Sequence, residues 1–530
     1  MKKHYFLTLF AFSSLISWGQ YDSLNMNKIG HLPYPTTELN DVWGYVDSLD
    51  NEFALVGARN SFSVVDISTP SNPVEVFNIP GAYSVWRDVK TWDDHAYVIH
   101  DNYSGTTDGI LIVDLTDMDS TPTFTKFYPM IPESDSSQFF LYTRSHNVYI
   151  DENGVLYVFG ANVKNGGVLM FDLTVDPMNP VYLGMWDEHY LHDGMVRGDT
   201  LWGGGILTGN LYAIDVSNKA NPVTMGSITT PSAFTHNCWV SDDGKTVYTT
   251  DEVPDAYIAS YDVTDLSNIT ELDRVQSSYG LDVIPHNTHV YGDFLVTSYY
   301  TSGLQIVDAE YPNNLVEVGY YDHSAFFGNT YSGSWGAYPY LPSGLILSTD
   351  IEEGLFVLSS PYVRASRFSG VVVDSVTGTP IPIAGVNFIS SGESVTADLM
   401  GEFIIGNTLT SQDTIMVQQP GYKTYELPVT WISGQNQNVV IELVPETVGV
   451  EEWVGALPVI YPNPSASGAF TIDYAGEELD RFAVYNTVGQ LILESDFVDG
   501  REEIQLNSGF YFVHLTAHSG ATAVVKIIAQ

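Results

Sequence analysis

Residues 61–68 read SFSVVDIS, and this phrase decides the fold because the chain repeats it. The phrase is an apolar strand that ends in an aspartate and runs into a turn rich in Pro and Asn. Its copies end at Asp66, Asp114, Asp172, Asp215, Asp262 and Asp308, and a seventh strand, LFVLSS at 355–360, has Ser359 in the aspartate position. Neighbouring aspartates lie 43 to 58 residues apart, close to the roughly 40–50 residues of a four-stranded propeller blade. Because one such repeat cannot bury its own faces, the copies are expected to pack together in a ring.

The second repeat shows the expected four strands most clearly. They read WRDVKTW at 86–92, AYVIH at 96–100, GILIVDL at 109–115 and TFTKFY at 123–128. The seventh repeat stops near residue 360 without a fourth strand, while LNMNKIGHL at 24–32 resembles the fourth strands NPVYLGMWD at 179–187 and NLVEVGYYD at 314–322. The N-terminal segment is therefore predicted to complete the seventh blade, which would also remove an open sheet edge.

The phrases VVDIS, LIVDL and IVDAE resemble the LVIVD repeat, and their arrangement resembles the choice-of-anchor B surface proteins of bacteria. The resemblance spans about residues 24–360. It implies a secreted β-propeller and brings no established reaction with it.

Composition and the N-terminus both indicate an exported protein. The first 19 residues carry Lys2 and Lys3, then an apolar run and small residues, which is the pattern of a secretory signal peptide. The chain has 64 acidic and 19 basic residues and a formal charge of −45, which argues against nucleic acid or an anionic membrane surface as a partner. No later stretch is long and apolar enough for a transmembrane segment, and the single cysteine, Cys238, excludes an intramolecular disulfide.

The repeated aspartates are predicted to be structural. Each stands at a strand end, where a carboxylate can accept hydrogen bonds from the backbone of the following turn. The recurrence of these six aspartates in register is therefore explained by the turn, and no chemistry is assigned to them.

Candidate functional residues occur at the start of each blade's first strand. The first strand of a propeller blade lines the central channel, so side chains at one phase in successive blades should converge near one mouth of it. The candidates are Arg87, Asp88, His146, His192, Asp193, His236, Asn237, His286 and Asn287. The ends of the second strands should bring Arg59, His100, Asp101, Asp251, Glu252 and Asp350 to the same rim.

Three interpretations of this set stay open. The residues could serve packing and hydrogen bonding between blades, or they could bind a ligand or substrate. They could also hold a divalent cation, with His146, His192, His236 and His286 as ligands, because neutral imidazole is a common metal ligand. No cofactor is identified by any motif of known spacing, and no nucleophile elbow or HExxH motif is present.

Two further regions follow the repeats. The phrases FSGVVVDSVTGTPIPIAGVNF (368–388), ADLMGEFII (397–405) and QQPGYKTYELPV (418–429) resemble the carboxypeptidase regulatory-like domain, a small transthyretin-like β-sandwich. The phrases YPNP (461–464), VYNTVGQ (484–490) and SGFYFVHL (508–515) resemble the type A C-terminal sorting domain of type IX secretion. That second resemblance implies a small immunoglobulin-like sandwich that is read by an outer-membrane translocon.

The sequence thus predicts an all-β chain, with a seven-bladed β-propeller followed by two small β-sandwich domains. The expected boundaries are a signal peptide at 1–19, the propeller at 20–366, the regulatory-like domain at 367–445, a linker at 446–458 and the sorting domain at 459–530. The expected place is outside a Gram-negative bacterium, secreted or on its outer surface, with the type IX secretion machinery as a partner of residues 459–530. The leading functional hypothesis is binding of a protein or glycan on the propeller face. An extracellular hydrolase or lyase that uses the His and carboxylate cluster, and a structural or adhesive surface component, are the alternatives.

Overall fold

A computed structural model of the 530-residue chain describes residues 22–102, 105–118, 122–133, 138–446, 458–474, 479–497, 501–518 and 521–530. The described residues form strands and turns and contain no helix, so the all-β prediction is confirmed. Correspondingly, a search of these residues for a helix of bilayer-spanning length and apolarity finds none. The chain divides into two compact units, Met1–Tyr362 and Val363–Gln530. The expected signal peptide and most of the expected linker fall outside the described residues.

The first unit contains seven antiparallel sheets of four strands or more, each a blade of the propeller. Blade 1 comprises β3 (Leu39–Val46), β4 (Glu52–Ala58), β5 (Ser61–Asp66) and β6 (Val74–Pro80). Blade 2 comprises β7 (Val89–Trp92), β8 (His95–Val98), β9 (Ile110–Asp114) and β10 (Phe124–Phe127). Blade 3 comprises β13 (Asn147–Ile150), β14 (Val155–Phe159), β15 (Val168–Asp172) and β16 (Val181–Trp186). Blade 4 comprises β17 (Asp193–Arg197), β18 (Thr200–Gly205), β19 (Asn210–Asp215) and β20 (Val223–Thr229).

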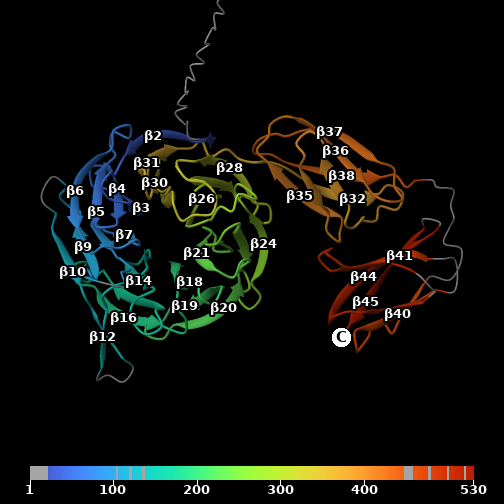
Figure 1. Cartoon of the computed structure of the whole chain (residues 1–530), viewed down its shortest axis with the longest axis horizontal. Coiled ribbons are helices and arrows are strands. Elements are labelled where there is room, and N and C mark those ends of the chain that lie inside the picture. Colours follow the sequence, from blue (N-terminus) through green and yellow to red (C-terminus); the bar gives the residue numbers. More distant parts are fainter. Residues whose placement is uncertain are drawn as a thin grey trace, which may run out of the picture. The chain divides into compact units, whose positions relative to one another are not determined.

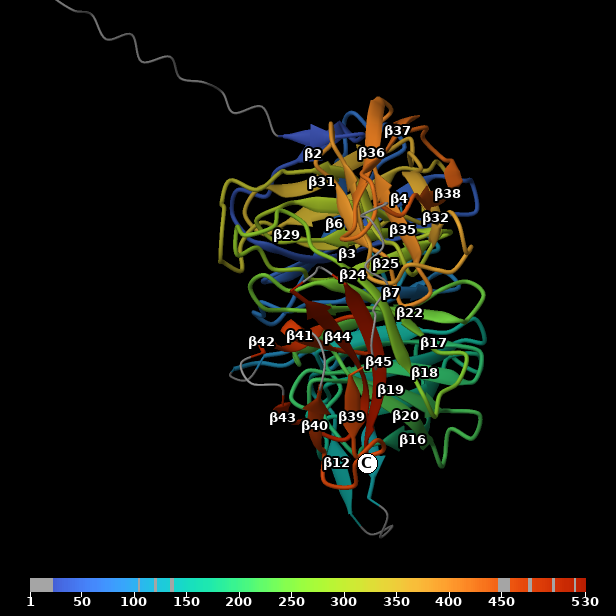
Figure 2. The same ribbon diagram turned by 90° about the vertical axis from the view of Figure 1, so that its right-hand side faces the viewer.

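The remaining blades follow in chain order. Blade 5 comprises β21 (Thr235–Val240), β22 (Thr246–Asp251), β23 (Ile258–Asp262) and β24 (Thr270–Val275). Blade 6 comprises β25 (Thr288–Tyr291), β26 (Phe294–Ser298), β27 (Leu304–Asp308) and β28 (Val316–Tyr321), with the short β1 (Ser23–Leu24) at its edge. Blade 7 comprises β29 (Ser334–Tyr338), β30 (Ile346–Asp350), β31 (Gly354–Ser359) and β2 (Asn27–Leu32). A hairpin of β11 (Met130–Pro132) and β12 (Phe139–Leu141) leaves the ring between blades 2 and 3, and its projection is visible in Figure 1 and Figure 2.

The blades are arranged in a closed ring around a central channel (Figure 1). Their first strands are neighbours in the cyclic order β3, β7, β13, β17, β21, β25 and β29, and β29 in turn contacts β3. Apolar side chains fill the layers between blades; between blades 1 and 2 these include Leu55, Val64, Val98 and Leu111, each at most 1% exposed. Truncation of a side chain buried in this way costs about 2–5 kcal/mol of stability. The ring is therefore stabilised by blade-to-blade packing as well as by the sheets themselves.

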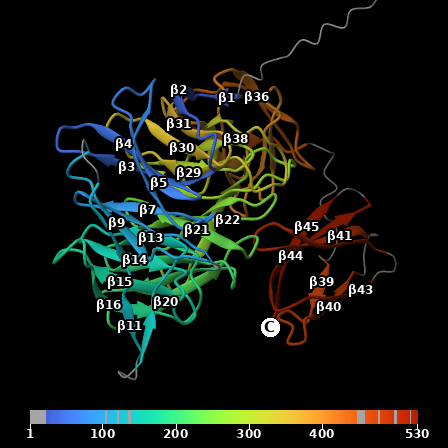
Figure 3. The same cartoon turned by 60° about the vertical axis from the view of Figure 1, so that its left-hand side comes forward.

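The seventh blade is completed by the N-terminal segment, as predicted. β2 pairs antiparallel with β31, with Asn27 opposite Ser359 and Leu32 opposite Leu355, and Figure 3 shows β2 beside β31. A bulge between Lys28 and Gly30 brings the glycine against the first blade's turn. A Cβ added to Gly30 would lie 1.9 Å from the carbonyl oxygen of Pro70, so this contact requires glycine. Gly184 and Gly226 meet the turns of their next blades in the same way, which identifies β2 as an ordinary fourth strand.

The repeated aspartates hold the turns that follow their strands. Oδ1 of each accepts a hydrogen bond from the backbone N–H two residues later, at 2.8–3.0 Å. In blades 2, 3 and 5 the same oxygen also accepts a bond from the hydroxyl of Thr116, Thr174 or Thr264. The structural interpretation of the motif is confirmed by these bonds.

The second unit contains two pairs of sheets. In the first pair, β35-β32-β38 and β34-β33-β36-β37 enclose Trp431, which is 1% exposed and packs on Phe368 and Phe388. The second pair is β39-β40-β43 and β42-β41-β44-β45, with Val484 and Val513 fully buried in its core. The bounds of the first pair are β32 (Ser366–Asp374), β33 (Gly385–Phe388), β34 (Ser394–Thr396), β35 (Glu402–Asn407), β36 (Gln412–Gln418), β37 (Tyr425–Thr430) and β38 (Asn436–Leu443). Those of the second are β39 (Val459–Tyr461), β40 (Ala469–Asp473), β41 (Leu479–Asn486), β42 (Leu491–Asp496), β43 (Arg501–Gln505), β44 (Gly509–Ala517) and β45 (Thr522–Ala529). Each pair is a β-sandwich with its own apolar core.

Candidate functional site

A backbone irregularity recurs where the first strand of a blade begins. The ladder between β21 and β22 skips His236, and the ladder between β29 and β30 skips Trp335. A β-bulge of this kind changes the direction of a side chain relative to the regular pleat. It allows His236 and its neighbour Asn237 both to be buried, at 2% and 7% exposure.

The four candidate histidines lie in one continuous row. The ring centroids are 3.8 Å apart for His146 and His192, 4.3 Å for His192 and His236, and 4.6 Å for His236 and His286. Trp335 lies next to the His286 end of the row, with its centroid at 4.7 Å. Successive blades therefore bring these imidazoles into contact.

Carboxylates flank this row on both sides. Asp193 Oδ1 lies 3.1 Å from His192 Nδ1, and its Oδ2 lies 3.8 Å from His236 Nδ1. Glu252 Oε2 lies 3.6 Å from His236 Nε2, and its Oε1 lies 4.0 Å from His286 Nε2. The histidine at the other end, His146, contacts Asp101 through Nδ1 at 3.2 Å.

Burial sets the protonation of this cluster. It lowers the pKa of His192 to about 3 and that of His286 to about 4, and it lowers the pKa of His236 as well. It raises the pKa of Glu252 to about 8 and that of Asp193 to about 6. The imidazoles are therefore neutral near pH 7, and each neutral ring has a nitrogen lone pair that can bind a proton or a metal.

Four of the five residues that follow a candidate histidine or arginine connect neighbouring blades. Asp88 accepts a bond from Asn147 Nδ2 at 2.8 Å, and Asn147 Oδ1 accepts one from Gly194 N at 3.3 Å. Asn237 continues the series, because its Nδ2 donates to Asp193 Oδ2 at 3.3 Å and its Oδ1 accepts from Thr288 N at 3.1 Å. We call Asp88, Asn147, Asp193 and Asn237 the inter-blade clasp. Three of these residues, Asp88, Asp193 and Asn237, belong to the predicted site, and all four have a structural task.

The two remaining candidates are also buried. Arg87 donates from Nε to the carbonyl oxygen of Ala58 at 2.9 Å and from Nη2 to that of Ala82. These bonds tie blade 2 to blade 1 and occupy the guanidinium. Asn287 is 8% exposed, and its Oδ1 has no hydrogen-bond partner among the described residues.

A cavity of about 370 Å³ opens beside the histidine row. Its lining comes from blades 1, 2, 5, 6 and 7 and consists of Leu39, Asn40, Arg59, Val85, Trp86, Glu252, Tyr300, Tyr331, Trp335 and Ile351. Trp86 and Trp335 also border a smaller space of about 20 Å³, which His146, His236, His286 and Asp193 line. That smaller volume is enough for about one water molecule or ion. We call the larger space the aromatic cavity.

Two groups of side chains could each hold a metal ion. His236, Glu252 and His286 form one, and His146, His192 and Asp193 form the other; in each group the three ligand atoms lie within 4.8 Å of one another. The sequence placed the histidines at one phase and Glu252 at the same rim, but it gave no reason to prefer Glu252 to its neighbours or to select Tyr300. Tyr300 Oη donates to Glu252 Oε1 at 2.5 Å, and this pairing joins the ends of second strands in two different blades.

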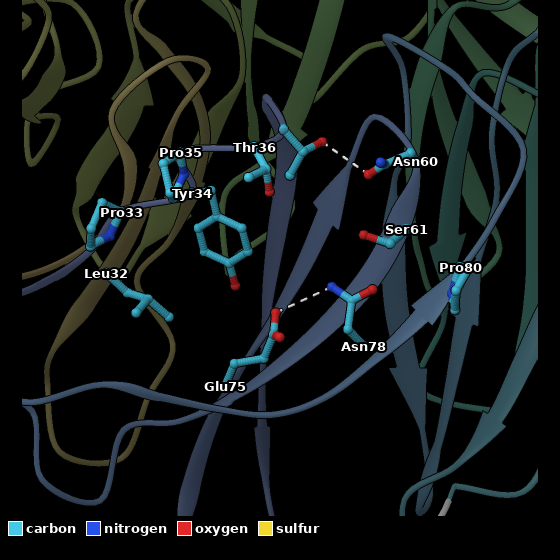
Figure 4. Close-up of a pocket in the computed structure, with 11 residues that line it drawn as sticks. Leu32, Pro33, Tyr34, Pro35, Thr36, Asn60, Ser61, Glu75, Asn78 and Pro80 are labelled. Atoms are coloured by element: carbon cyan, nitrogen blue, oxygen red, sulfur yellow. Dashed lines mark hydrogen bonds between the residues drawn. The ribbon is translucent and has the colours of Figure 1, made fainter.

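A second cavity, of about 460 Å³, lies outside the ring's centre. It is bordered by the connection between β2 and β3 and by blade 1, and Figure 4 shows Tyr34, Asn60, Glu75 and Asn78 on its wall. Asn78 Nδ2 donates to Glu75 Oε2 at 3.2 Å, and Ser63 Oγ donates to the same oxygen at 2.7 Å. Because its polar groups bond to one another, this cavity has less to offer a ligand than the aromatic cavity.

Comparison with known proteins identifies all three kinds of module. The LVIVD repeat model matches residues 48–80 and 207–230, the CarboxypepD_reg-like domain matches 368–454, and the secretion system C-terminal sorting domain matches 459–530. No curated protein matches the chain. A solved structure described as a putative 6-phosphogluconolactonase from Bacteroides uniformis aligns with a TM-score of 0.41 and 16% identity over 51% of this chain and 82% of that one, a likeness too weak to bear on function.

The sorting domain indicates delivery to the cell surface or the extracellular space, and it implies contact with the secretion machinery. The sequence-based identification of the modules and of the protein's location is therefore confirmed. The chain is a secreted protein that combines LVIVD repeats with a carboxypeptidase regulatory-like domain and a C-terminal sorting domain of the type IX secretion system.

Proposed function

We propose that the propeller binds the end of a glycan chain in the aromatic cavity, outside the cell. The observation that carries this proposal is the combination of four aromatic side chains with Arg59, Asn40 and Glu252 around one space of about 370 Å³. Ligand sites are concave, commonly about 300–1,000 Å³ in volume, and mostly apolar with a few convergent polar groups. The aromatic cavity fits this description.

A sugar is favoured by the chemistry of the wall. Aromatic faces from blades 2, 6 and 7 offer apolar surfaces for the C–H side of a sugar ring, while the indole N–H and phenol O–H groups can bond to its hydroxyls. Arg59, paired with Glu38 and half-buried, adds a fixed cation at the rim. A chain end can enter such a hollow, whereas a flat protein surface cannot. A protein ligand remains the alternative that the test below separates.

The test is binding of the secreted protein to a panel of oligosaccharides, measured by calorimetry and by quenching of tryptophan fluorescence. Trp335→Ala should abolish binding of the glycan that the parent selects, because Trp335 borders both the cavity and the histidine row. Tyr279→Ala is the matched control, since Tyr279 is an aromatic residue 84% exposed that does not line the cavity. The proposal would be contradicted if Trp335→Ala and Tyr279→Ala lost glycan binding equally, or if neither substitution changed it.

A second candidate function is hydrolysis or elimination at the bound glycan. It is favoured by Glu252, whose pKa is raised to about 8 by burial, so that the carboxyl holds a proton near neutral pH and can act as a general acid. Glu252→Gln would then bind the selected glycan and fail to convert it. Chromatography of the glycan after incubation with parent and variant gives the answer. A product formed equally by both proteins would exclude Glu252 as the acid.

A further inference from the structure

We propose that His236, Glu252 and His286 bind one divalent transition-metal ion, with Zn²⁺ the best match, at the bottom of the aromatic cavity. The site requires no glycan and is independent of the binding proposal above, whereas a Glu252 carboxylate that holds the ion is not the general acid of the second candidate function. Two imidazoles and one carboxylate are a donor set that zinc uses in catalytic sites, where the fourth position stays open.

The positions of the donor atoms fit one shared ion. Bonds of about 2.0–2.1 Å in a tetrahedral site place neighbouring ligand atoms about 3.3 Å apart. Glu252 Oε2 lies 3.6 Å from His236 Nε2 and Glu252 Oε1 lies 4.0 Å from His286 Nε2. One ligand atom from each of the three residues lies within 4.8 Å of the other two. These separations would have to shorten by roughly 0.3 to 1.5 Å to reach tetrahedral coordination, which rotation of the three side chains would have to supply.

Outer contacts already orient two of the three ligands. His286 Nδ1 donates to the carbonyl oxygen of Trp335 at 2.7 Å, which leaves the lone pair on Nε2, the nitrogen that faces Glu252. Tyr300 Oη donates to Glu252 Oε1 at 2.5 Å. Metal-binding histidines and carboxylates generally have such second partners, which fix the tautomer and the direction of the ligand.

The third ligand is incompletely bonded. His236 is 2% exposed, and its Nδ1 has no hydrogen-bond partner among the described residues. Asp193 Oδ2 lies 3.8 Å from that atom, so a small movement would create the carboxylate–histidine pair that is common behind a metal. A buried imidazole with an unpaired nitrogen is costly, and an ion on Nε2 would strengthen the Nδ1–H···Asp193 contact.

The open position of the site would face the aromatic cavity. Glu252 lines that cavity, and Trp335, whose carbonyl oxygen orients His286, lines it as well. A ligand oxygen entering from the cavity could therefore occupy the fourth position. The ion would polarise that oxygen and provide orientation that aromatic contacts alone do not give.

The neighbouring group of His146, His192 and Asp193 is the weaker candidate. Its carboxylate already connects two blades, because Asp193 Oδ2 accepts a bond from Asn237 in the inter-blade clasp. Binding a metal there would break contacts between blades. The proposal is therefore restricted to His236, Glu252 and His286.

The experiment uses the full secreted chain after treatment with a chelator. Zn²⁺ is added, and bound metal is measured after gel filtration; Co²⁺ is added in parallel, and its visible absorption reports tetrahedral nitrogen and oxygen ligands. The parent should bind one ion and gain thermal stability, as a ligand specific for the native state requires. His236→Gln and Glu252→Gln should each lose the stoichiometric ion and the absorption band.

The control variant is His289→Gln, which removes a buried histidine that packs on Trp239 and lies outside both groups; it should bind the ion as the parent does. Tyr300→Phe should weaken binding about 10–100-fold, the usual effect of removing an outer partner. Glu252→Gln still accepts the bond from Tyr300, so it remains informative if His236→Gln does not fold. Any other pattern overturns the proposal, including binding that survives in Glu252→Gln through the acidic surface or that is lost equally in His289→Gln.

Discussion

Asp88 Oδ2 of blade 2 accepts a hydrogen bond from Asn147 Nδ2 of blade 3, at a distance of 2.8 Å. The same oxygen accepts a bond from Val148 N at 2.9 Å, and Asp88 Oδ1 contacts Lys90 Nζ at 2.5 Å. The carboxylate thus connects two blades close to the channel. A carboxylate with this many donor partners is stabilised in its ionised form. Burial by itself would raise the pKa of Asp88, but the contacts with Lys90 and the backbone lower it.

Replacement of Asn147 should weaken the ring without changing the aromatic cavity. Asn147→Ala removes the bond to Asp88 and the bond from Gly194, and each leaves a buried polar group short of a partner. We expect a loss of about 1–3 kcal/mol in the free energy of unfolding, measured by denaturant unfolding of the secreted protein. Asn153→Ala, at an exposed hairpin turn of the same blade, is the control and should unfold like the parent.

The repeated aspartates should tolerate one substitution and not another. Asp262→Asn keeps an oxygen that can accept the bonds from Thr264 N and Thr264 Oγ1, now 2.9 and 2.6 Å long, so its stability should be close to that of the parent. Asp262→Ala removes both acceptors and should unfold at a lower temperature than Asp262→Asn. Thermal unfolding of the two variants makes the comparison. Equal stability of both variants would show that the turn does not need the side-chain bonds.

The stability of the propeller should fall in acid partly through His100. Burial, with Arg87 nearby, lowers the pKa of this histidine from 6.5 to about 4. The unfolded chain therefore binds a proton at higher pH than the folded one. The contribution of neutral His100 to the free energy of unfolding is fully present above about pH 6.5 and is lost as the pH falls toward 4. The slope is at most about 1.4 kcal/mol per pH unit for one group. His100→Gln should show a smaller decrease in free energy of unfolding between pH 6.5 and 4; an identical decrease would contradict this.

Removal of residues 459–530 should affect transport and leave the rest folded. The sorting domain has its own strands and its own core, so its deletion exposes no core of the propeller. In an expressing bacterium, the truncated protein should accumulate in the periplasm, whereas the full chain should reach the medium or the cell surface. Cell fractionation and protease protection measure this. Efficient export of the truncated protein would contradict the role of the domain.

The repeat explains why part of the site could be predicted from the sequence. The phase of the SFSVVDIS phrase predicted the strand order and placed His146, His192, His236 and His286 on one side of the ring, because each blade repeats the same geometry. The phase could not supply the distances of 3.8–4.6 Å between neighbouring rings, and nothing in the sequence indicates the bulge at the start of β21 that skips His236.

Other parts of the site had no sequence signal of that kind. Glu252 directly follows Asp251 at the end of β22, and nothing in the sequence distinguishes these two acidic residues. Its partner Tyr300 is contributed by the next blade. Arg87 shared the phase of the histidines, but burial directs its guanidinium to backbone carbonyls. In both cases the role of the side chain depends on a contact with a residue distant in the sequence. A local sequence pattern carries no information about such a contact.

The pairing of β2 with β31 also fixes an order of events during synthesis. The strand Asn27–Leu32 leaves the ribosome first, yet its partner Gly354–Ser359 is made only after all the other repeats. Until β31 is made, β2 has no strand to pair with, so sheet edges stay open to other chains. A nascent or truncated chain that ends before residue 359 is consequently expected to aggregate more readily than the full chain, because the ring closes only when the last repeat is complete.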